Sequence, residues 1–348
     1  MGTALGAHRY PQQEITSAFA GVVTADPVAL ALLRRFHSAA GVETRHLALP
    51  LDEYAGLDGF TAANDAFIRL GVDLGAGAVD RALQAGGLEP RDVDVIMTTT
   101  VTGVAAPSLD ARLVPRLGLR SDVKRLPLFG LGCVAGAAGV ARLHDYLLGH
   151  PDDVAVLLSV ELCSLTVQRD DASTANLVAS GLFGDGAAAV IMLGERRAAE
   201  LGVVAPQVIG SRSRMYPDTE RVMGWDIGGT GFRIVLAASV ADVVEEHLGV
   251  DVKAFLADHD LEVDDIEHWV SHPGGPKVLE AISRTLALPG HALVRSWRSL
   301  ARLGNLSSAS VLHVLGQTLA ERPAGTRAPG LLMAMGPGFC SELVLLRW

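Results

Sequence analysis

The sequence predicts an α/β fold in which helices cover both faces of largely parallel sheets, built as two similar halves. Short apolar runs of β type alternate with longer Ala/Leu-rich segments of helical pattern, which is the rhythm of βαβ units. A second series of the same kind follows later in the chain. The 348 residues, 49% of them hydrophobic, are enough for two domains or one large duplicated body.

The first series lies between residues 93 and 160. A strand is expected over Val93–Thr100, followed by a helix over Ser108–Leu117. Another helix starts after Cys133, in an Ala-rich segment, and the apolar run Val154–Val160 predicts a buried strand. The order of these elements along the chain is strand, helix, helix, strand.

The second series starts with a short strand at Trp269–Ser271, which leads through a Gly-Gly-Pro turn into a helix over Lys277–Leu286. Gly304 then precedes a helix over Ser307–Glu321. The chain ends with a pair of strands, Leu331–Met335 and Cys340–Arg347. The two series look like variations on one theme, although no residue-level repeat is visible.

A polar stretch, Gly194–Glu200, interrupts two apolar strands and marks the expected join between the halves. We therefore divide the chain into an N-terminal half, 1–195, and a C-terminal half, 196–348. The join has no Gly/Ser or Pro repeats of the kind that flexible linkers contain. The halves are expected to share one interface.

Composition excludes several classes of protein. The formal net charge is −10, and no Lys/Arg block offsets it locally, so a nucleic-acid partner is not expected. The apolar runs fall short of the roughly 18 residues that a membrane span needs. The first 30 residues carry charged and amide side chains where an export signal would be apolar. We expect a cytoplasmic protein without a membrane span.

The three cysteines, Cys133, Cys163 and Cys340, are too widely spaced for a disulfide framework or a CxxC zinc site. Gly228–Phe232 is glycine-rich but lacks the GxGxxG spacing of a dinucleotide loop. We expect neither a metal nor a resident cofactor. Each cysteine must be judged by its own surroundings.

Cys133 lies between glycines that permit a tight strand-to-helix turn, and an Ala-rich helical run follows it. This places the thiol at a helix N-terminus, where unpaired N–H groups and the helix dipole favour a thiolate, the reactive form of cysteine. The alternative is a small buried apolar side chain, which is what most isolated cysteines are. This segment alone does not decide between the two.

Two further turns carry polar side chains of complementary chemistry. His272 ends a short strand, and the Pro-Gly-Gly that follows forces a turn which projects the imidazole from the sheet edge. Asn305 stands between a Gly turn and a helix, where the alternative role is an N-cap. With Cys133 they would supply a nucleophile, a base or donor, and a neutral amide donor. The three together predict an acyl-transferring enzyme.

Five motifs in this order resemble the type III polyketide synthases of the chalcone synthase superfamily, in particular bacterial members that make alkylpyrones and alkylresorcinols. The resemblance extends from about Gly41 to the C-terminus. The related ketoacyl synthase III enzymes typically have His-Gln-Ala-Asn where this chain has His-Pro-Gly-Gly. The motifs are Gly132-Cys133, Gly184-Asp-Gly186, His272-Pro-Gly-Gly-Pro276, Gly304-Asn305-Leu-Ser-Ser308 and Met335-Gly-Pro-Gly338.

The resemblance implies a thiolase-like fold, with two pseudo-duplicated αβαβα halves forming a five-layered body in a homodimer. It also implies that Cys133 accepts an acyl group from an acyl-CoA starter and extends it by repeated decarboxylative condensation with malonyl-CoA. His272 and Asn305 would stabilise the enolate, and His272 would also hold Cys133 as a thiolate in an ion pair. Cyclisation would give a pyrone or resorcinol type of product.

By the same resemblance, Phe183 is the aromatic gate between the coenzyme A tunnel and the cavity. Arg45 is the coenzyme A contact, with a solvated surface arginine as the alternative. Ala106, which replaces a larger residue of plant members, suggests room for a long acyl starter. Besides Phe183, the positions assigned to the cavity are mostly small. They are Thr102, Ala106, Cys163, Thr166, Gly231, Ser307, Gly336 and Pro337, the last two in a cyclisation-pocket loop.

Three alternatives stay open at this point. Cys163 resembles the corresponding residue of bacterial tetrahydroxynaphthalene synthases, so a synthase primed by malonyl-CoA itself is one. A ketoacyl synthase III-like priming enzyme would perform a single condensation with the same three residues. A non-catalytic thiolase-like subunit would only bind acyl thioesters. The number of condensations discriminates the first two, and an intact set of catalytic residues counts against the third.

Overall fold

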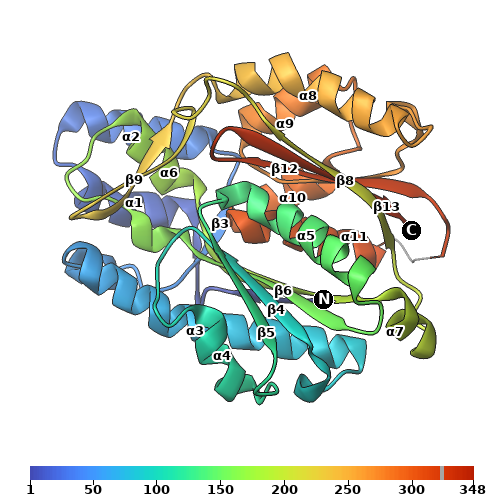
Figure 1. Cartoon of the computed structure of the whole chain (residues 1–348). Helices are drawn as coiled ribbons and strands as arrows, with labels where there is room; N and C mark the ends of the chain where they lie inside the picture. The colour runs from blue at the N-terminus through green and yellow to red at the C-terminus, as the bar shows by residue number, and fades with distance from the viewer. Residues whose placement is uncertain (322–324) are drawn as a thin grey trace.

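Two β-sheets form the framework of the computed structural model, which describes residues 1–321 and 325–348 (Figure 1). The first sheet has the strand order β1-β7-β6-β4-β5, and the second has the order β11-β12-β13-β8. The strands of the first sheet are β1 (Gly2–Leu5), β4 (Val95–Thr100), β5 (Lys124–Phe129), β6 (Val154–Leu162) and β7 (Asp185–Leu193). Those of the second are β8 (Gln207–Met215), β11 (His268–Ser271), β12 (Pro329–Gly336) and β13 (Cys340–Arg347).

Helices fill three layers around the two sheets (Figure 1). Helices α3 (Gly59–Gly86) and α4 (Leu109–Leu117) cover the outer face of the first sheet, and α8 (Val240–Ala257) and α9 (Pro276–Thr285) cover that of the second. Between the sheets lie α5 (Ala135–Gly149) and α11 (Ser308–Glu321), with α10 (Val294–Leu303) beside α11. This five-layered α/β arrangement confirms the thiolase-like architecture.

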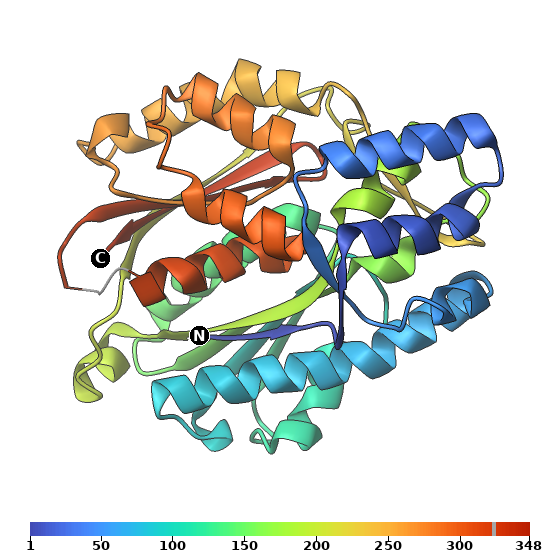
Figure 2. The same ribbon diagram turned by 180° about the vertical axis from the view of Figure 1, so that it is seen from behind.

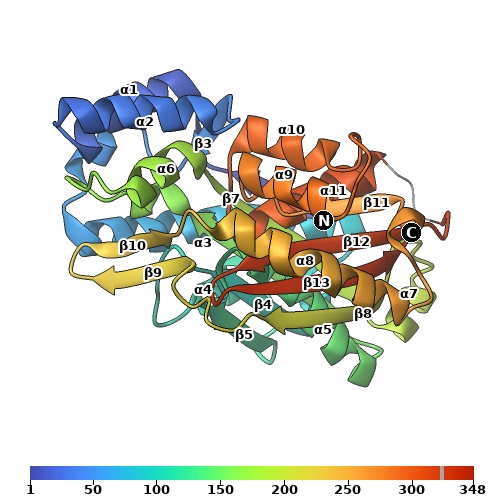
Figure 3. The same ribbon diagram turned by 90° about the horizontal axis from the view of Figure 1, so that it is seen from above.

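Most of the remaining elements gather at one end of the body, whereas α7 lies at the other end (Figure 1). Helices α1, α2 and α6 pack together at the first of these ends, and a hairpin of β9 and β10 extends beside α6 and α3 (Figures 2 and 3). A second small ribbon pairs β2 with β3, and α7 joins the two sheets. The bounds are α1 (Gln12–Val23), α2 (Pro27–Ala39), α6 (Thr174–Leu182), α7 (Glu195–Glu200), β2 (His8–Pro11), β3 (Thr44–Leu47), β9 (Met223–Gly228) and β10 (Gly231–Leu236).

The two halves repeat one topology. In the first, β4 runs parallel to β6, β6 antiparallel to β7, and β7 antiparallel to β1. In the second, β11 runs parallel to β12, β12 antiparallel to β13, and β13 antiparallel to β8. The chain order β1-α3-β4-α5-β6-β7 is matched by β8-α8-β11-α11-β12-β13. Helices α5 and α11 are therefore equivalent central helices.

The expectation of largely parallel sheets is wrong in part, because each sheet is mixed. Parallel pairing is confined to the β5-β4-β6 group and the β11-β12 pair. The strands with central helices between them run parallel, as crossover connections require. In the second half, β13 turns back from β12 through a short connection around Gly338 and so pairs antiparallel. In the first half, β7 also pairs antiparallel with β6, although a longer connection that contains α6 joins them.

Strand β1 is an element that the sequence patterns do not predict. It adds to the edge of the first sheet beside β7 and lies against α3. The approach is close enough that a Cβ on Gly2 would stand 2.2 Å from the carbonyl oxygen of Ala78. Only glycine fits at that contact.

The proposed division at residues 195 and 196 falls between β7 and β8, where the chain passes from one sheet to the other. A cluster of buried apolar side chains around α5 and α11 includes residues from both sheets, among them Leu157, Val190, Leu332 and Val344. The two halves thus share a core layer. Within the described part of the chain, no helix combines the length and apolar character that crossing a membrane requires.

Candidate active site

Cys133 lies where the first sheet meets its central helix. It belongs to a single 3-10 turn, Gly132–Val134, that continues directly into α5. Gly132 has a φ of +58°, and a Cβ there would stand 2.6 Å from Cδ of Pro337. Glycine at this position therefore lets the loop from the second sheet close over the turn, and the Cys133 side chain is buried.

Asn305 occupies the equivalent place in the second half, just before α11. Its Oδ1 accepts a hydrogen bond from the backbone N–H of Ser307 at 2.8 Å, and its Nδ2 donates to the carbonyl of Gly274 at 3.2 Å. Asn305 is not the N-cap of α11, which begins at Ser308, because its Oδ1 accepts from a residue that precedes the helix. The backbone of Asn305 also pairs with the segment around Phe183, accepting from Gly184 N and donating to Leu182 O.

His272 is the first residue after β11. Its backbone N–H donates to Met333 O, and its carbonyl accepts from Gly274 N, so the strand and the turn hold it from both sides. The side chain is buried. Among residues 1–321 and 325–348, neither ring nitrogen has a hydrogen-bond partner. Both are available to a substrate or to the thiol.

The fold brings the three predicted residues to one place. The Cys133 thiol donates to Ser307 Oγ at 3.6 Å, and the Asn305 side chain lies close enough to Cys133 to influence its ionisation. The hydrogen bond from Asn305 Nδ2 to the Gly274 carbonyl links Asn305 to the turn that follows His272. The N-termini of the two central helices and the end of β11 thus converge on one point.

The structure does not contain the ion pair expected between Cys133 and His272, both of which it describes. Burial raises the pKa of the Cys133 thiol to about 12, and the Ser307 hydrogen bond offsets this only in part. Burial also lowers the pKa of His272 to about 3. Desolvation thus disfavours the charged form of each group taken singly, and no hydrogen bond joins the thiol to either His272 ring nitrogen among the described residues. A neutral imidazole can accept the thiol proton when a thioester arrives.

Glu161 is a site residue that sequence reasoning missed. It is fully buried at the end of β6 and accepts hydrogen bonds from Ser308 Oγ, Thr102 Oγ1 at 2.9 Å and the backbone of Val101 at 3.1 Å. Burial raises its pKa to about 7, and its charge acts on the Cys133 thiol. A carboxylate directly after the apolar run Val154–Val160 is the signal that could have identified it.

Replacing Glu161 by glutamine tests this buried carboxyl. The folded pKa of about 7 exceeds the ordinary value of 4.5, so the group favours folding when protonated, and wild-type stability falls as pH rises through this window. The glutamine side chain cannot ionise. The melting temperature of Glu161→Gln relative to wild type is therefore expected to increase by a few degrees from pH 5 to pH 8. A constant difference in thermal melts would contradict the assignment.

Several predicted cavity residues do line one narrow cavity near the nucleophile. Cys163, Thr166 and Phe183 face it, together with Trp225 and Ile234 of the β9-β10 hairpin. Gly336 and Pro337 close over the Cys133 turn, since a Cβ on Gly336 would meet the Leu131 carbonyl at 2.7 Å. Ser307 contacts the thiol directly.

Other predicted positions lie elsewhere. Thr102 is buried, and its hydroxyl is used by Glu161 and the Leu162 N–H. Ala106 is exposed on the surface of this chain and cannot shape the cavity from within one subunit. Gly231 is backed by Phe60, whose ring would stand 3.2 Å from a Cβ there. Its assignment to the cavity stays a prediction.

The assignment of Arg45 to coenzyme A is wrong. The side chain is 0% exposed, its Nε donates to Gln12 Oε1 at 3.0 Å, and its Nη1 donates to Phe183 O at 2.6 Å. A nucleotide phosphate outside the protein cannot reach it. Alternation along β3 turns Arg45 inward, and the charge pattern of the sequence did not reveal this.

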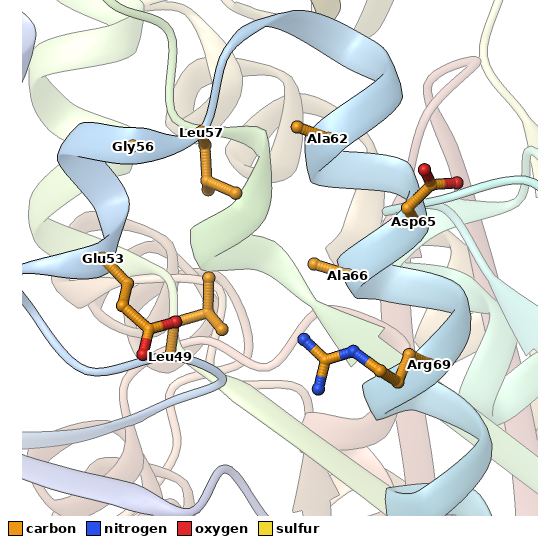
Figure 4. A pocket seen from close by; sticks show the side chains of 8 residues that line it. All are labelled: Leu49, Glu53, Gly56, Leu57, Ala62, Asp65, Ala66 and Arg69. Carbon is orange, nitrogen blue, oxygen red and sulfur yellow. The ribbon is translucent and has the colours of Figure 1, made fainter.

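A second hollow lies between the first turns of α3 and the segment that precedes it (Figure 4). Leu49, Glu53 and Leu57 form one wall, while Asp65 and Arg69 project from α3. None of the predicted site residues lines this hollow. Of the described residues, no group of three or more His, Cys, Asp or Glu side chains is arranged to hold a metal ion.

The site has the parts of a condensing enzyme that works through a cysteine thioester. Comparison with known proteins agrees. A family model described as FAE1/Type III polyketide synthase-like protein matches residues 71–209, and the C-terminal domain of chalcone and stilbene synthases matches residues 207–348.

Individual relatives match over nearly the whole chain. A 1,3,6,8-tetrahydroxynaphthalene synthase of Streptomyces peucetius is 57% identical over 99% of this chain and 91% of its own length. A phloroglucinol synthase of Pseudomonas fluorescens is 28% identical over 98% and 96%. The crystal structure of a tetrahydroxynaphthalene synthase from Streptomyces coelicolor superposes with a TM-score of 0.91 at 30% identity, covering 100% of this chain and 97% of that one.

This chain belongs to the type III polyketide synthases. It is an acyltransferase that forms carbon–carbon bonds from malonyl-CoA. The relatives include enzymes of the tetrahydroxynaphthalene type, which the sequence kept as an alternative to pyrone and resorcinol synthesis.

Proposed function

We propose that this enzyme is primed by malonyl-CoA, extends the chain on Cys133 with further malonyl-CoA, and cyclises it to a polyhydroxylated naphthalene. The observation that carries this proposal is the 57% identity, over 99% of this chain, to a tetrahydroxynaphthalene synthase. The cavity agrees with it. Phe183, Trp225 and Ile234 line a narrow space beside Cys163, and walls of this kind suit a compact aromatic product better than a long alkyl chain.

Loading begins with transfer of the Cys133 thiol proton to the neutral His272 imidazole. The thiolate attacks the thioester carbonyl, and coenzyme A leaves as a thiol with the proton that His272 returns. Ser307, which accepts from the thiol, helps to orient the sulfur. Loading therefore needs no lasting ion pair.

Extension follows when malonyl-CoA loses carbon dioxide beside His272 and Asn305. The electron pair of the broken bond moves onto the thioester oxygen, where N–H groups of both side chains stabilise the enolate. The enolate carbon attacks the acyl group on Cys133, and the cysteine sulfur leaves as a thiolate. Asn305 suits this step because a neutral amide donates hydrogen bonds without protonating the carbanion.

The product test uses malonyl-CoA alone. The ten ring carbons of a tetrahydroxynaphthalene equal five two-carbon units, so uniformly labelled malonyl-CoA should label every carbon of the product. Mass spectrometry is expected to show this product without any added starter. A requirement for a long acyl-CoA, found with starters of graded length, would instead favour the alkylpyrone or alkylresorcinol alternative. A product of one condensation would favour a priming synthase.

We also propose a homodimer formed through strand β5. This strand ends the first sheet, and most of its side chains are exposed, with Leu126 at 38% and Phe129 at 47%. An uncovered edge of this kind usually pairs with another element. Ala106 follows β4 on the same side, so a second copy could bring it near a cavity.

Leu126→Asp is expected to convert the dimer to a monomer, because a carboxylate would be buried without a partner at the subunit contact. Light scattering after size-exclusion chromatography measures the change. Val250→Asp is the matched control, since Val250 is 70% exposed on α8, which covers the second sheet rather than the one that contains β5. An unchanged dimer in Leu126→Asp would contradict this interface.

A cytoplasmic location is part of the proposal. The three cysteines are free, and Cys133 and Cys163 are buried. The proposed role of Cys133 requires a free thiol. A reducing compartment preserves free thiols. Cell fractionation with activity assays would test the location.

A further inference from the structure

Arg45 has one donor group to which the fold gives no partner. Its Nε and Nη1 are used by Gln12 and by the carbonyl of Phe183, whereas Nη2 has no hydrogen-bond partner within residues 1–321 and 325–348. The side chain is completely buried. Buried donors are almost always satisfied, so an orphan guanidinium nitrogen calls for an explanation.

The cavity provides one. Arg45 is among its lining residues, with Cys163 and Phe183. Since Nε and Nη1 are directed to protein acceptors, Nη2 is the donor left for whatever fills this space. Strand β3 and the two bonds hold the guanidinium in a fixed orientation.

The buried carboxylate that balances Arg45 is engaged by other donors. Asp185 accepts from the backbone N–H groups of Ser164 at 2.8 Å and Ala48 at 2.6 Å, and from Ser164 Oγ. Burial lowers the pKa of Arg45 to about 10, and the charge of Asp185 acts against this lowering. The guanidinium is thus kept charged inside the protein while one of its nitrogens stays available.

Resting on the proposed function, we infer that Arg45 Nη2 donates a hydrogen bond to a ketone or enolate oxygen of the growing polyketide. A chain built from malonyl units carries an oxygen on every second carbon, and the intervening carbons lose protons readily to give enolates. A fixed, always charged donor binds such an oxygen more strongly than a neutral one. Arg45 is therefore a binding residue for the intermediate.

This contact holds the distal part of the chain away from the thioester on Cys133. Early cyclisation would need that part to fold back onto the thioester carbonyl. Arg45 consequently favours further extension over early release. Phe183, whose carbonyl is bonded to Nη1, couples the gate to the same guanidinium.

The first test compares products of Arg45→Lys and Arg9→Lys with those of wild type, using malonyl-CoA. Lysine at position 45 keeps the charge but loses the oriented Nη2 donor, so early-released lactones should increase relative to full-length product by about tenfold or more. Arg9→Lys is the matched control, because Arg9 is exposed on the neighbouring strand β2. Its product ratio should stay near wild type. An unchanged ratio in Arg45→Lys would overturn the inference.

The second test does not depend on the folding of an Arg45 variant. Acetylacetone is added to Cys133→Ala protein, and the near-ultraviolet absorbance of its enolate is measured. Binding at Arg45 should raise the enolate fraction, with the released proton passing to the buffer. The rise should persist in Cys133→Ala protein that also carries His272→Ala and Asn305→Ala, in which the other proposed enolate site is absent. The dimethylated analogue, which cannot form an enolate, should give no signal. If acetylacetone gives no more enolate than in buffer, the inference is wrong.

The two proposals fail in distinguishable ways. If malonyl-CoA does not load Cys133, the proposed function itself fails. If Cys133 is loaded and product forms, but neither the product ratio nor the enolate signal depends on Arg45, only the inference about Arg45 is lost.

Discussion

Cys133→Ala is expected to lose polyketide formation by roughly 10³-fold or more, because no acyl chain can be held for extension. Decarboxylation of malonyl-CoA should persist, since His272 and Asn305 still stabilise the enolate. The two activities are measured separately, by product formation and by release of carbon dioxide from labelled malonyl-CoA. The variant should retain its fold, because alanine fits a buried position at the start of α5.

Cys163→Ala is the matched control. Cys163 is also buried and close to the site, and burial next to Glu161 and Asp185 raises its pKa well above the ordinary range. Side-chain hydrogen bonds with Ser307 and Asn305 act against this effect of burial at Cys133, whereas only a backbone hydrogen bond does so at Cys163. Equal losses of product in the two variants would show that Cys133 is not the sole attachment point.

Asn305→Ala is expected to slow decarboxylation by about 10²–10³-fold, the usual effect of removing one donor from an oxyanion site. Loading of Cys133 should continue, because His272 is still present to accept the thiol proton. Release of labelled carbon dioxide measures the first step, and intact-protein mass spectrometry measures the second.

Part of any Asn305 effect could come from the loss of its structural bonds to Ser307 and Gly274. Asn305→Asp keeps an acceptor for Ser307 N but removes the amide donor. It should therefore resemble Asn305→Ala in decarboxylation while melting closer to wild type. Full activity in Asn305→Asp would refute the donor role.

Much of the fold could be predicted because local pattern and tertiary structure agree. The expected strand Val93–Thr100 is β4 at Val95–Thr100, and the helix expected over Lys277–Leu286 is α9 at Pro276–Thr285. Strand direction could not be predicted, since β1 pairs with β7 across nearly the full first half of the chain. Such pairing leaves no local pattern in either strand.

The positions of the three proposed catalytic residues were predictable for a related reason. Cys133, His272 and Asn305 each stand at a glycine-containing turn, so their positions at the ends of elements can be recognised in sequence. Arg45 and Glu161 have no such turn. Both owe their roles to burial, and a charged residue on a strand looks the same in sequence whether its side chain faces water or the core.

The duplicated topology explains why the site lies where it does. Equivalent helices α5 and α11 present their N-termini to one point, so one half contributes the proposed nucleophile and the other the proposed amide donor. His272, the proposed base, directly follows β11. Neither half could assemble these three groups alone.

The most direct test of this account is peptide mapping by mass spectrometry after wild-type enzyme is quenched during turnover with malonyl-CoA. The account predicts a ladder of acyl adducts, differing by two-carbon units, on the peptide that contains Cys133. Adducts located on Cys163 or Cys340 instead, or a single acyl mass that never lengthens, would contradict it.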